Sequence, residues 1–230
     1  SFHSSNIYNT KLQVMDLGLF NRCFLITAAS SGLGFAAAEQ LVAERANVVL
    51  VARTEQKLSE AADKLGQDSA AFLVADLADE NTAEAAVQLA KQRFGRLDGA
   101  FVSVGGPPKG AVLENTDAQW QDAFNSVFLS ALRVARAVVA ENKAARLGFV
   151  LSTSSKTPLP SMAISNGLRP GLGVLVKQLA DEIGPDGGRA FGILPGSIST
   201  ERMIYLNQQT PDPAATKAAA EAQIPLRRYG

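Results

Sequence analysis

Histidine and cysteine are nearly absent from this 230-residue chain, which contains one of each. A single histidine, His3, excludes a Ser-His-Asp hydrolase and argues against a metal site built on imidazoles. A single cysteine, Cys23, excludes a disulfide within the chain and fits a reducing cytosol. Cys23 also begins an apolar segment, which favours a buried thiol without a chemical role.

An excess of charge of either sign is missing as well. Lys and Arg together number 22, as do Asp and Glu, so bulk charge attracts neither nucleic acid nor an anionic membrane. No apolar run approaches the roughly 20 residues that a bilayer span needs. We therefore predict a cytoplasmic protein that needs no metal, binds neither nucleic acid nor membrane, and acts on a small molecule. A homo-oligomer is left open.

The start of the chain is polar and aperiodic, and it lacks the basic region and apolar core of a secretory signal. Met15 is a candidate natural start, so we expect residues 1–15 to be a flexible leader or an expression remnant. The chain is 47% apolar, which is enough for a sizeable core. We predict that residues 16–230 form one α/β domain.

Apolar strand-like segments alternate with helix-like segments along the chain. A fully apolar run such as NVVLVA (47–52) is typical of a parallel strand that is covered on both faces. The alternation predicts a doubly wound parallel sheet in three layers, α/β/α, with right-handed crossovers, which is the Rossmann-like arrangement. We predict strands at 22–27, 47–52, 70–76, 98–104, 147–153 and 189–194, and helices at 32–46, 54–66, 80–95, about 116–143, and a last one up to about 183.

In such a sheet the ligand crevice lies beyond the carboxyl ends of the strands. The segment LITAASSGLG (25–34) joins the first strand to the first helix, where backbone N–H groups and the helix dipole attract phosphate. Glycines permit close backbone approach there, and two serines can donate to phosphate. Ala28 replaces the first glycine of the usual motif and is unstrained only at negative φ. An ordinary strand–helix turn is the alternative interpretation.

Six segments of the chain are each a weak match to a family motif, but their occurrence together in this order is specific. They are TAASSGLG, VADLAD, FVSVGGPP, VLSTSS, LGVLVKQLADEIGPDGGRA and ILPGSIST. Over residues 18–230 they resemble the short-chain dehydrogenase/reductase family, particularly its ketoacyl-reductase-like members. The resemblance implies a Rossmann-like fold and hydride transfer between NAD(P)(H) and a carbonyl or alcohol. Family members usually add a helix and a strand after a segment like IPLRRYG, so we expect the family's last strand to be lacking.

The resemblance also implies a set of cofactor contacts. Arg53 follows the second strand, where NAD-preferring members tend to have an acid that binds the ribose hydroxyls. Its guanidinium suits a 2′-phosphate, so NADP(H) is favoured over NAD(H), with a solvated charge at a strand end as the alternative interpretation. Asp76 matches a residue beside adenine, although it is equally placed to cap the next turn. The implied cofactor-binding residues are Thr27, Ala28, Ser30, Ser31, Gly32, Leu33, Gly34, Arg53, Asp76, Leu77, Gly105, Arg169, Pro195, Gly196, Ile198 and Thr200.

The family's catalytic asparagine, serine, tyrosine and lysine are only partly present. Ser154 matches the serine, but Val127 stands at the asparagine position. The segment SNGLR aligns Ser165 with the tyrosine and Arg169 with the lysine. A serine hydroxyl has a pKa well above that of a phenol, and a guanidinium is a poor proton donor. Because Pro170 disfavours helical geometry in the residue before it, we expect the helix to begin at Pro170, which would keep Ser165 and Arg169 from lying one turn apart.

Other groups are candidates for the missing acid. Lys156 follows the serine run, with a solvated loop lysine as the alternative, so the candidate catalytic set is Ser154, Ser165, Arg169 and Lys156. Ser152 and Ser155 are alternates to Ser154, and Tyr205 is a candidate on a lid, with a surface or core tyrosine as its alternative. Substrate walls are expected at 106–115, 155–164 and 200–215.

Three functions are compatible with these residues. The first is an NADP(H)-dependent oxidoreductase with Ser165 and Arg169 in place of tyrosine and lysine, aided by water or Lys156. The second is a pseudoenzyme that binds a dinucleotide and acts as a sensor or partner subunit. The third is an α/β protein that binds another small molecule in its crevice.

Overall fold

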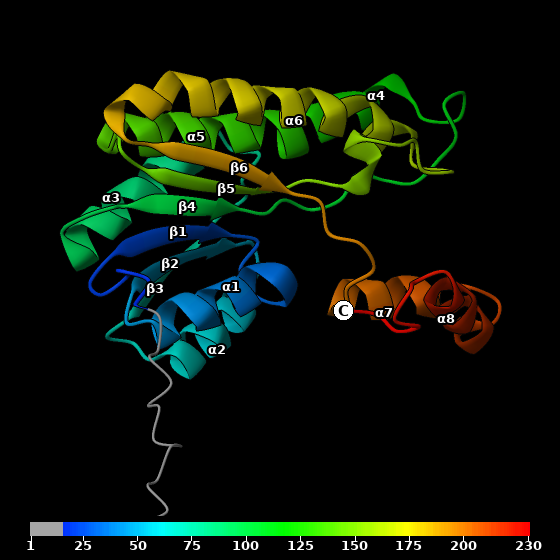
Figure 1. Cartoon of the computed structure of the whole chain (residues 1–230), viewed down its shortest axis with the longest axis horizontal. Coiled ribbons are helices and arrows are strands. Elements are labelled where there is room, and N and C mark those ends of the chain that lie inside the picture. Colours follow the sequence, from blue (N-terminus) through cyan, green and yellow to red (C-terminus); the bar gives the residue numbers. More distant parts are fainter. Residues whose placement is uncertain (1–15) are drawn as a thin grey trace, which may run out of the picture.

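A parallel sheet forms the centre of the molecule in the computed structural model, which describes residues 16–230 (Figure 1). Its strands are β1 (Cys23–Thr27), β2 (Asn47–Ala52), β3 (Ala70–Val74), β4 (Gly99–Val102), β5 (Arg146–Val150) and β6 (Arg189–Ile193). Their order is β3-β2-β1-β4-β5-β6, and every neighbouring pair is parallel. The reversal of order between β1 and β4 is the doubly wound pattern, so the predicted Rossmann-like fold is confirmed.

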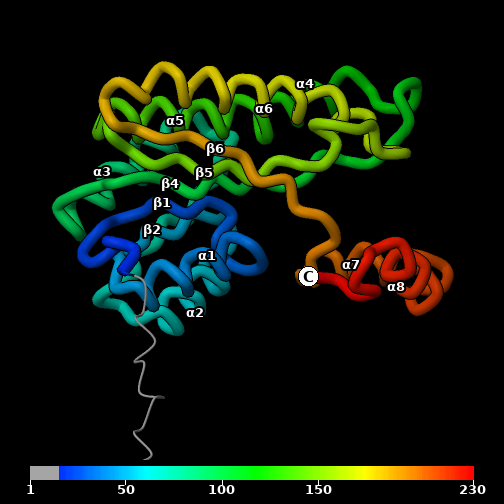
Figure 2. Tube along the Cα trace, viewed as in Figure 1, coloured from blue at the N-terminus to red at the C-terminus, as the bar shows by residue number. Residues whose placement is uncertain are grey.

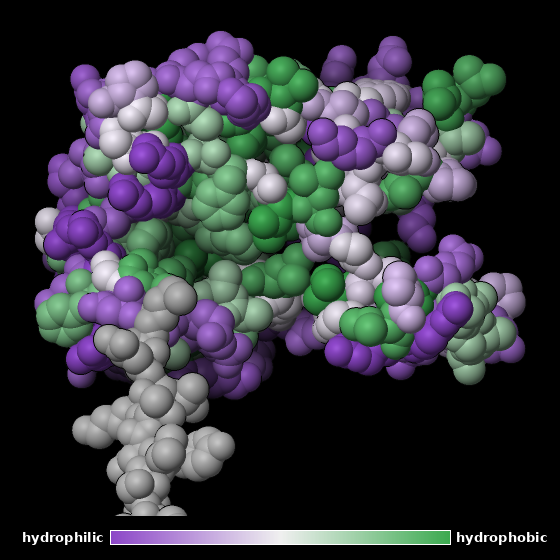
Figure 3. All heavy atoms as spheres, in the orientation of Figure 1, coloured by the Kyte–Doolittle hydropathy of each residue, from purple (hydrophilic) through white to green (hydrophobic). Residues whose placement is uncertain are grey.

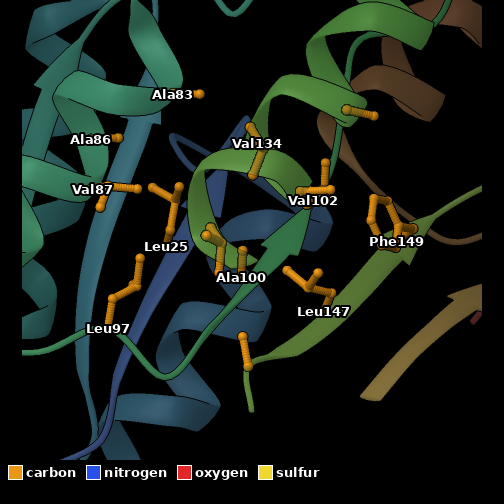
Figure 4. Close-up of a cluster of buried hydrophobic side chains, with 14 of the residues drawn as sticks. Leu25, Ala83, Ala86, Val87, Leu97, Ala100, Val102, Val134, Leu147 and Phe149 are labelled. Atoms are coloured by element: carbon orange, nitrogen blue, oxygen red, sulfur yellow. The ribbon is translucent and has the colours of Figure 1, made fainter. Parts of the chain in front are cut away.

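Helices cover both faces of the sheet. On one face, α1 (Gly32–Ala43) and α2 (Glu55–Leu65) pack against β1 and β2 through Ile26, Leu50 and Leu58. The other face carries α3 (Thr82–Phe94), α5 (Ser130–Glu141) and α6 (Ala163–Ile183). Figure 4 shows the core on that side, with side chains of β1, β4 and β5 against α3 and α5. The three predicted layers are therefore present.

The predicted helix at about 116–143 is one helical stretch with an irregular centre. It comprises α4 (Asp117–Ala123), a π-helical segment η1 (Phe124–Leu129) and α5. Among the described residues, this stretch, Asp117–Glu141, is long and apolar enough to cross a membrane by length and composition. Part of this stretch is in the core, since Val134 and Val138 of α5 are buried against α3 and the sheet.

Cys23 is buried at the start of β1, as expected. Burial, and secondly the negative charge of Asp98, raise the pKa of its thiol to about 12. The thiol therefore stays protonated at physiological pH and is a poor nucleophile, which agrees with a packing role.

The chain after β6 forms two short helices, α7 (Glu201–Gln208) and α8 (Pro213–Ala222), which lie beyond the carboxyl ends of the strands (Figure 1). Figure 2 shows Gly230 returning to the start of α7. Its backbone exchanges hydrogen bonds with Ser197 and Ser199, which fixes the segment that leads from β6 to α7. The expected substrate wall at 200–215 therefore consists mainly of these helices.

Candidate functional site

The glycine turn between β1 and α1 keeps an open, left-handed geometry. Ala28 has φ +48° and Gly32 has φ +60°. The alanine therefore does not meet the condition for an unstrained turn, and we assign it a strain of about 1 kcal/mol. A Cβ on Gly34 would lie 2.7 Å from the carbonyl oxygen of Ala28, so only glycine lets α1 start this close to the turn.

The serines of the turn lie at the start of α1 beside a polar cavity. Ser31 is the N-cap residue of α1 but its hydroxyl makes no capping hydrogen bond. Ser30, Ser31 and Gly32 line a polar cavity of about 190 Å³ together with Lys57 and Lys64 of α2, and the carboxylates of Glu60 and Glu201 line it as well. Lys57 is paired with Glu201. The serine hydroxyls, the N–H groups at the start of α1 and Lys64 suit phosphate oxygens, so this end of the cavity fits a dinucleotide phosphate.

Several predicted cofactor residues have partners within the protein. Thr27 is buried, and its hydroxyl donates to the carbonyl of Ser103 at 2.5 Å and accepts from the N–H of Ser103 at 2.8 Å, which ties the end of β1 to the segment after β4. The carboxylate of Asp76 accepts from the N–H of Ala78 at 2.9 Å. The capping alternative for Asp76 is therefore the arrangement observed. Thr200 caps α7 by accepting from the N–H of Met203 at 3.2 Å.

The remaining predicted cofactor residues lie in the segments that follow the strands, at the carboxyl ends of the sheet. Arg53 is exposed at the end of β2. A Cβ on Gly105 or Gly196 would meet nothing within 4 Å, which shows open space at both loops. The side chain of Thr200 lies against Gly32, so the segment after β6 faces the glycine turn. The half-buried side chains are those of Leu33, Leu77, Pro195 and Ile198.

Three of the four candidate catalytic residues, Ser154, Ser165 and Arg169, form a buried cluster after β5 and near the start of α6. Ser154 and Ser165 are each 3% exposed, and their hydroxyl oxygens are 3.0 Å apart. Nη1 of Arg169 donates to the carbonyl oxygen of Val150, the last residue of β5, at 2.7 Å. Burial, and secondly the charge of Arg202, lower the pKa of Arg169 to about 10.

The prediction that this helix begins at Pro170 is wrong. Helix α6 begins at Ala163 and runs through Pro170 to Ile183, so Ser165 and Arg169 do lie one turn apart. A proline inside a helix costs about 3 kcal/mol because it removes a hydrogen bond and crowds the preceding turn. Tertiary contacts offset that cost here, since Ile164 and Leu172 are buried on either side of the proline.

The residue that the sequence analysis aligned with the family's asparagine has an apolar side chain. Val127 is 2% exposed within η1 and has no polar group to offer the site. Asn125, two residues earlier, instead donates to the carbonyl of Ala78 at 3.2 Å and accepts from Arg133 at 2.7 Å. The π-helical segment η1 therefore forms even though the side chain at position 127 is apolar.

The alternative acids do not join the cluster. Lys156 is exposed and lines a cavity beside β6 with Lys177 and Phe191. Tyr205 is 59% exposed on α7, in keeping with a surface tyrosine. Ser152 accepts from the N–H of Ser154 at 3.1 Å, and Ser155 donates to the carbonyl of Arg169 at 3.1 Å. His3 and Tyr8 lie outside the described residues.

One residue of the crevice was missed by the sequence analysis. The guanidinium of Arg202, in the first turn of α7, lies so close to Gly106 that a Cβ on this glycine would collide with it. The sequence does contain a signal for this helix: Thr200, at the end of LPGSIST, is a typical N-cap residue, and the charged residues Glu201 and Arg202 follow it. This pattern predicts a helix that begins directly after the segment.

Comparisons with known proteins identify the family and agree with the fold. A family model described as short chain dehydrogenase matches residues 22–211. A putative ketoacyl reductase of the monensin polyketide synthase from Streptomyces virginiae is 30% identical over 221 residues, covering 91% of this chain and 85% of that protein. Levodione reductase from Leifsonia aquatica is 33% identical over 225 residues, which cover 91% of this chain and 82% of that protein. L-sorbose reductase from Gluconobacter frateurii, whose crystal structure is a complex with NADPH and L-sorbose, is 28% identical in sequence. The two structures have a TM-score of 0.87, and the match covers 94% of this chain and 87% of that one.

Proposed function

Because the chain belongs to the short-chain dehydrogenase family, we propose that it is an NADP(H)-dependent oxidoreductase that acts on a carbonyl or alcohol substrate. The observation that carries the proposal is the buried Ser154–Ser165 pair, which lies beside Arg169 at the same sheet edge as the open glycine turn. This edge is where a doubly wound sheet binds its ligands.

The glycine turn and its surroundings would hold the cofactor. The N-terminus of α1, Ser30 and Ser31 would bind the pyrophosphate, and Arg53 would bind a 2′-phosphate. The 194–200 segment would cover the nicotinamide, which supplies or accepts the hydride when bound. NADPH in the L-sorbose reductase structure supports a phosphorylated dinucleotide.

The serine pair would orient the substrate and move the proton. The hydroxyls of Ser154 and Ser165 are close enough to share a carbonyl oxygen as hydrogen-bond donors. As hydride reaches the carbonyl carbon, Ser165 would donate its proton to the developing alkoxide and be reprotonated from water. The positive charge of Arg169 stabilises the negative charge on these oxygens, and its lowered pKa makes it a better proton donor than an exposed arginine.

A pseudoenzyme that binds a dinucleotide is the second candidate. It is favoured by the absence of a phenol beside Ser154 among residues 16–230, since Tyr205 is exposed on α7 and Tyr229 is buried near the chain end. In this role the crevice would act as a sensor or as part of a partner subunit, without turnover.

Measuring whether the protein reduces any of a panel of carbonyl compounds with NADPH distinguishes between these two functions. We expect Ser154→Ala to lower kcat by about 100-fold, because the substrate oxygen loses a positioned donor, while the Kd of NADPH stays unchanged. Fluorescence titration measures the Kd, and absorbance of NADPH measures turnover. Ser126→Ala, which removes an exposed hydroxyl from η1, is the matched control. Unchanged turnover in Ser154→Ala contradicts the assignment, and NADPH binding without turnover in the unmodified chain favours the pseudoenzyme.

Cofactor preference is tested at Arg53. We expect Arg53→Glu to weaken NADPH binding by about 100-fold, because a carboxylate repels the 2′-phosphate, and to leave NADH binding nearly unchanged. Both dissociation constants are measured by fluorescence titration. Arg136→Glu makes the same charge change at an exposed position on α5 and should affect neither. Equal losses for NADPH and NADH in Arg53→Glu would argue against a 2′-phosphate contact.

A further inference from the structure

The first turn of α7 spans the crevice. Glu201 pairs with Lys57 of α2, with 3.4 Å between Nζ and the carboxylate oxygen. The next residue, Arg202, extends to the opposite side and lies against Gly106 in the loop after β4. In Figure 3 the surface is notched between α7 and the part of the molecule above it. The guanidinium of Arg202 therefore lies beside the loop that follows β4, at the carboxyl ends of the strands.

Arg202 and Arg169 have no acidic partner within the described part of the chain. The ion pairs formed by residues 16–230 involve other side chains. Arg169 is 5% exposed, and its Nε is buried without a hydrogen-bond partner. The charge of Arg202 also contributes to the lowered pKa of Arg169, so the two cations repel each other. Such an arrangement is unfavourable unless a ligand supplies negative charge.

We propose that Arg202 binds a carboxylate of the substrate, with the buried charge of Arg169 adding to the attraction. The inference rests on the proposed function and narrows its substrate class to oxo acids and hydroxy acids. A guanidinium fork matches the two oxygens of a carboxylate, and the bond is charge-assisted. The reacting carbonyl would then lie at Ser154 and Ser165, deeper in the crevice than the carboxylate.

The position of the arginines favours a substrate carboxylate over a cofactor phosphate. The glycine turn follows β1 and Arg53 follows β2, whereas Arg202 contacts the loop after β4 and Arg169 contacts the end of β5. In the sheet, β1 and β2 are neighbours on one side of the switch point, and β4 and β5 are neighbours on the other. The proposed phosphate contacts, the glycine turn and Arg53, are both on the first side, which favours the substrate over a cofactor phosphate as the source of an anion at Arg202.

Calorimetry on the full chain tests the inference without relying on activity. The ligands are the oxo acids 2-oxobutyrate, acetoacetate and levulinate and their neutral methyl esters, titrated with NADP+ present, which cannot reduce them. We expect at least one acid to bind about tenfold tighter than its ester. Arg202→Gln should remove that preference and leave the Kd of NADP+ within about twofold. Arg189→Gln, at an exposed arginine at the amino end of β6, should change neither.

Other outcomes overturn the inference. Equal binding of acids and esters, or no binding of any acid, removes the carboxylate site. An equal loss of NADP+ and acid binding in Arg202→Gln assigns the arginine to a cofactor phosphate. The NADP+ titration separates these results from failure of the proposed function, because a chain that binds no dinucleotide refutes that function whatever the acids do.

Discussion

Gly34→Val is expected to abolish dinucleotide binding, with a loss in NADPH affinity of more than about 100-fold. A Cβ at this position would lie 2.7 Å from the carbonyl oxygen of Ala28 and 3.0 Å from that of Thr27. Both neighbours are backbone atoms, so α1 or the turn must move, and the N–H groups that we propose to bind the phosphate move with it. We also expect the free energy of unfolding to fall by about 1–3 kcal/mol from overpacking.

Ala28→Gly is the matched control in the same turn. Glycine accepts φ +48° without strain, so we expect the free energy of unfolding to rise by about 1 kcal/mol and NADPH binding to be kept. Urea unfolding and fluorescence titration measure both quantities. If Gly34→Val binds NADPH as the unmodified chain does, the turn is not the phosphate site, and the cofactor proposal fails with it.

Arg169→Met should stabilise the protein while it removes activity. The difference between the ordinary pKa of 12.5 and a value of about 10 corresponds to roughly 3 kcal/mol of unfavourable free energy for the buried charge. Methionine removes that charge and loses the hydrogen bond to Val150, worth about 1–2 kcal/mol, so we expect a net gain of about 1–2 kcal/mol. Turnover with NADPH should fall by about 100-fold or more, since the reacting oxygens lose a nearby cation.

The stability difference should depend on pH. In the unmodified chain the folded state loses the charge of Arg169 near pH 10, whereas the unfolded chain keeps it to higher pH. The unmodified protein therefore gains stability as pH rises above about 10, and the advantage of Arg169→Met shrinks. Arg133→Met is the control. The guanidinium of Arg133 donates hydrogen bonds to the side-chain oxygen of Asn125 and to the carbonyl of Ala78, so its loss should lower the free energy of unfolding. A lower stability in Arg169→Met would show that the buried charge is compensated.

The sheet could be predicted because buried parallel strands are uninterrupted apolar runs. The predicted 47–52 strand matches β2 at both ends. Its first residue is the polar Asn47, and the charged Arg53 follows its last. Predictions from short sequence patterns failed where tertiary packing determines the structure. Pro170 predicted a helix start, but buried side chains on both of its sides keep α6 continuous. Arg202 was missed because its neighbour across the crevice, Gly106, is distant in sequence and meets it only through the placement of α7.

The ion pair between Lys57 and Glu201 has a consequence for the exchange of bound molecules. Both side chains are more than half exposed, and such a pair is worth at most about 1 kcal/mol and weakens with ionic strength. The contact that joins α7 to α2 across the entrance therefore breaks readily by thermal motion. Ligands would enter and leave without a large barrier at this point, and added salt would speed their release.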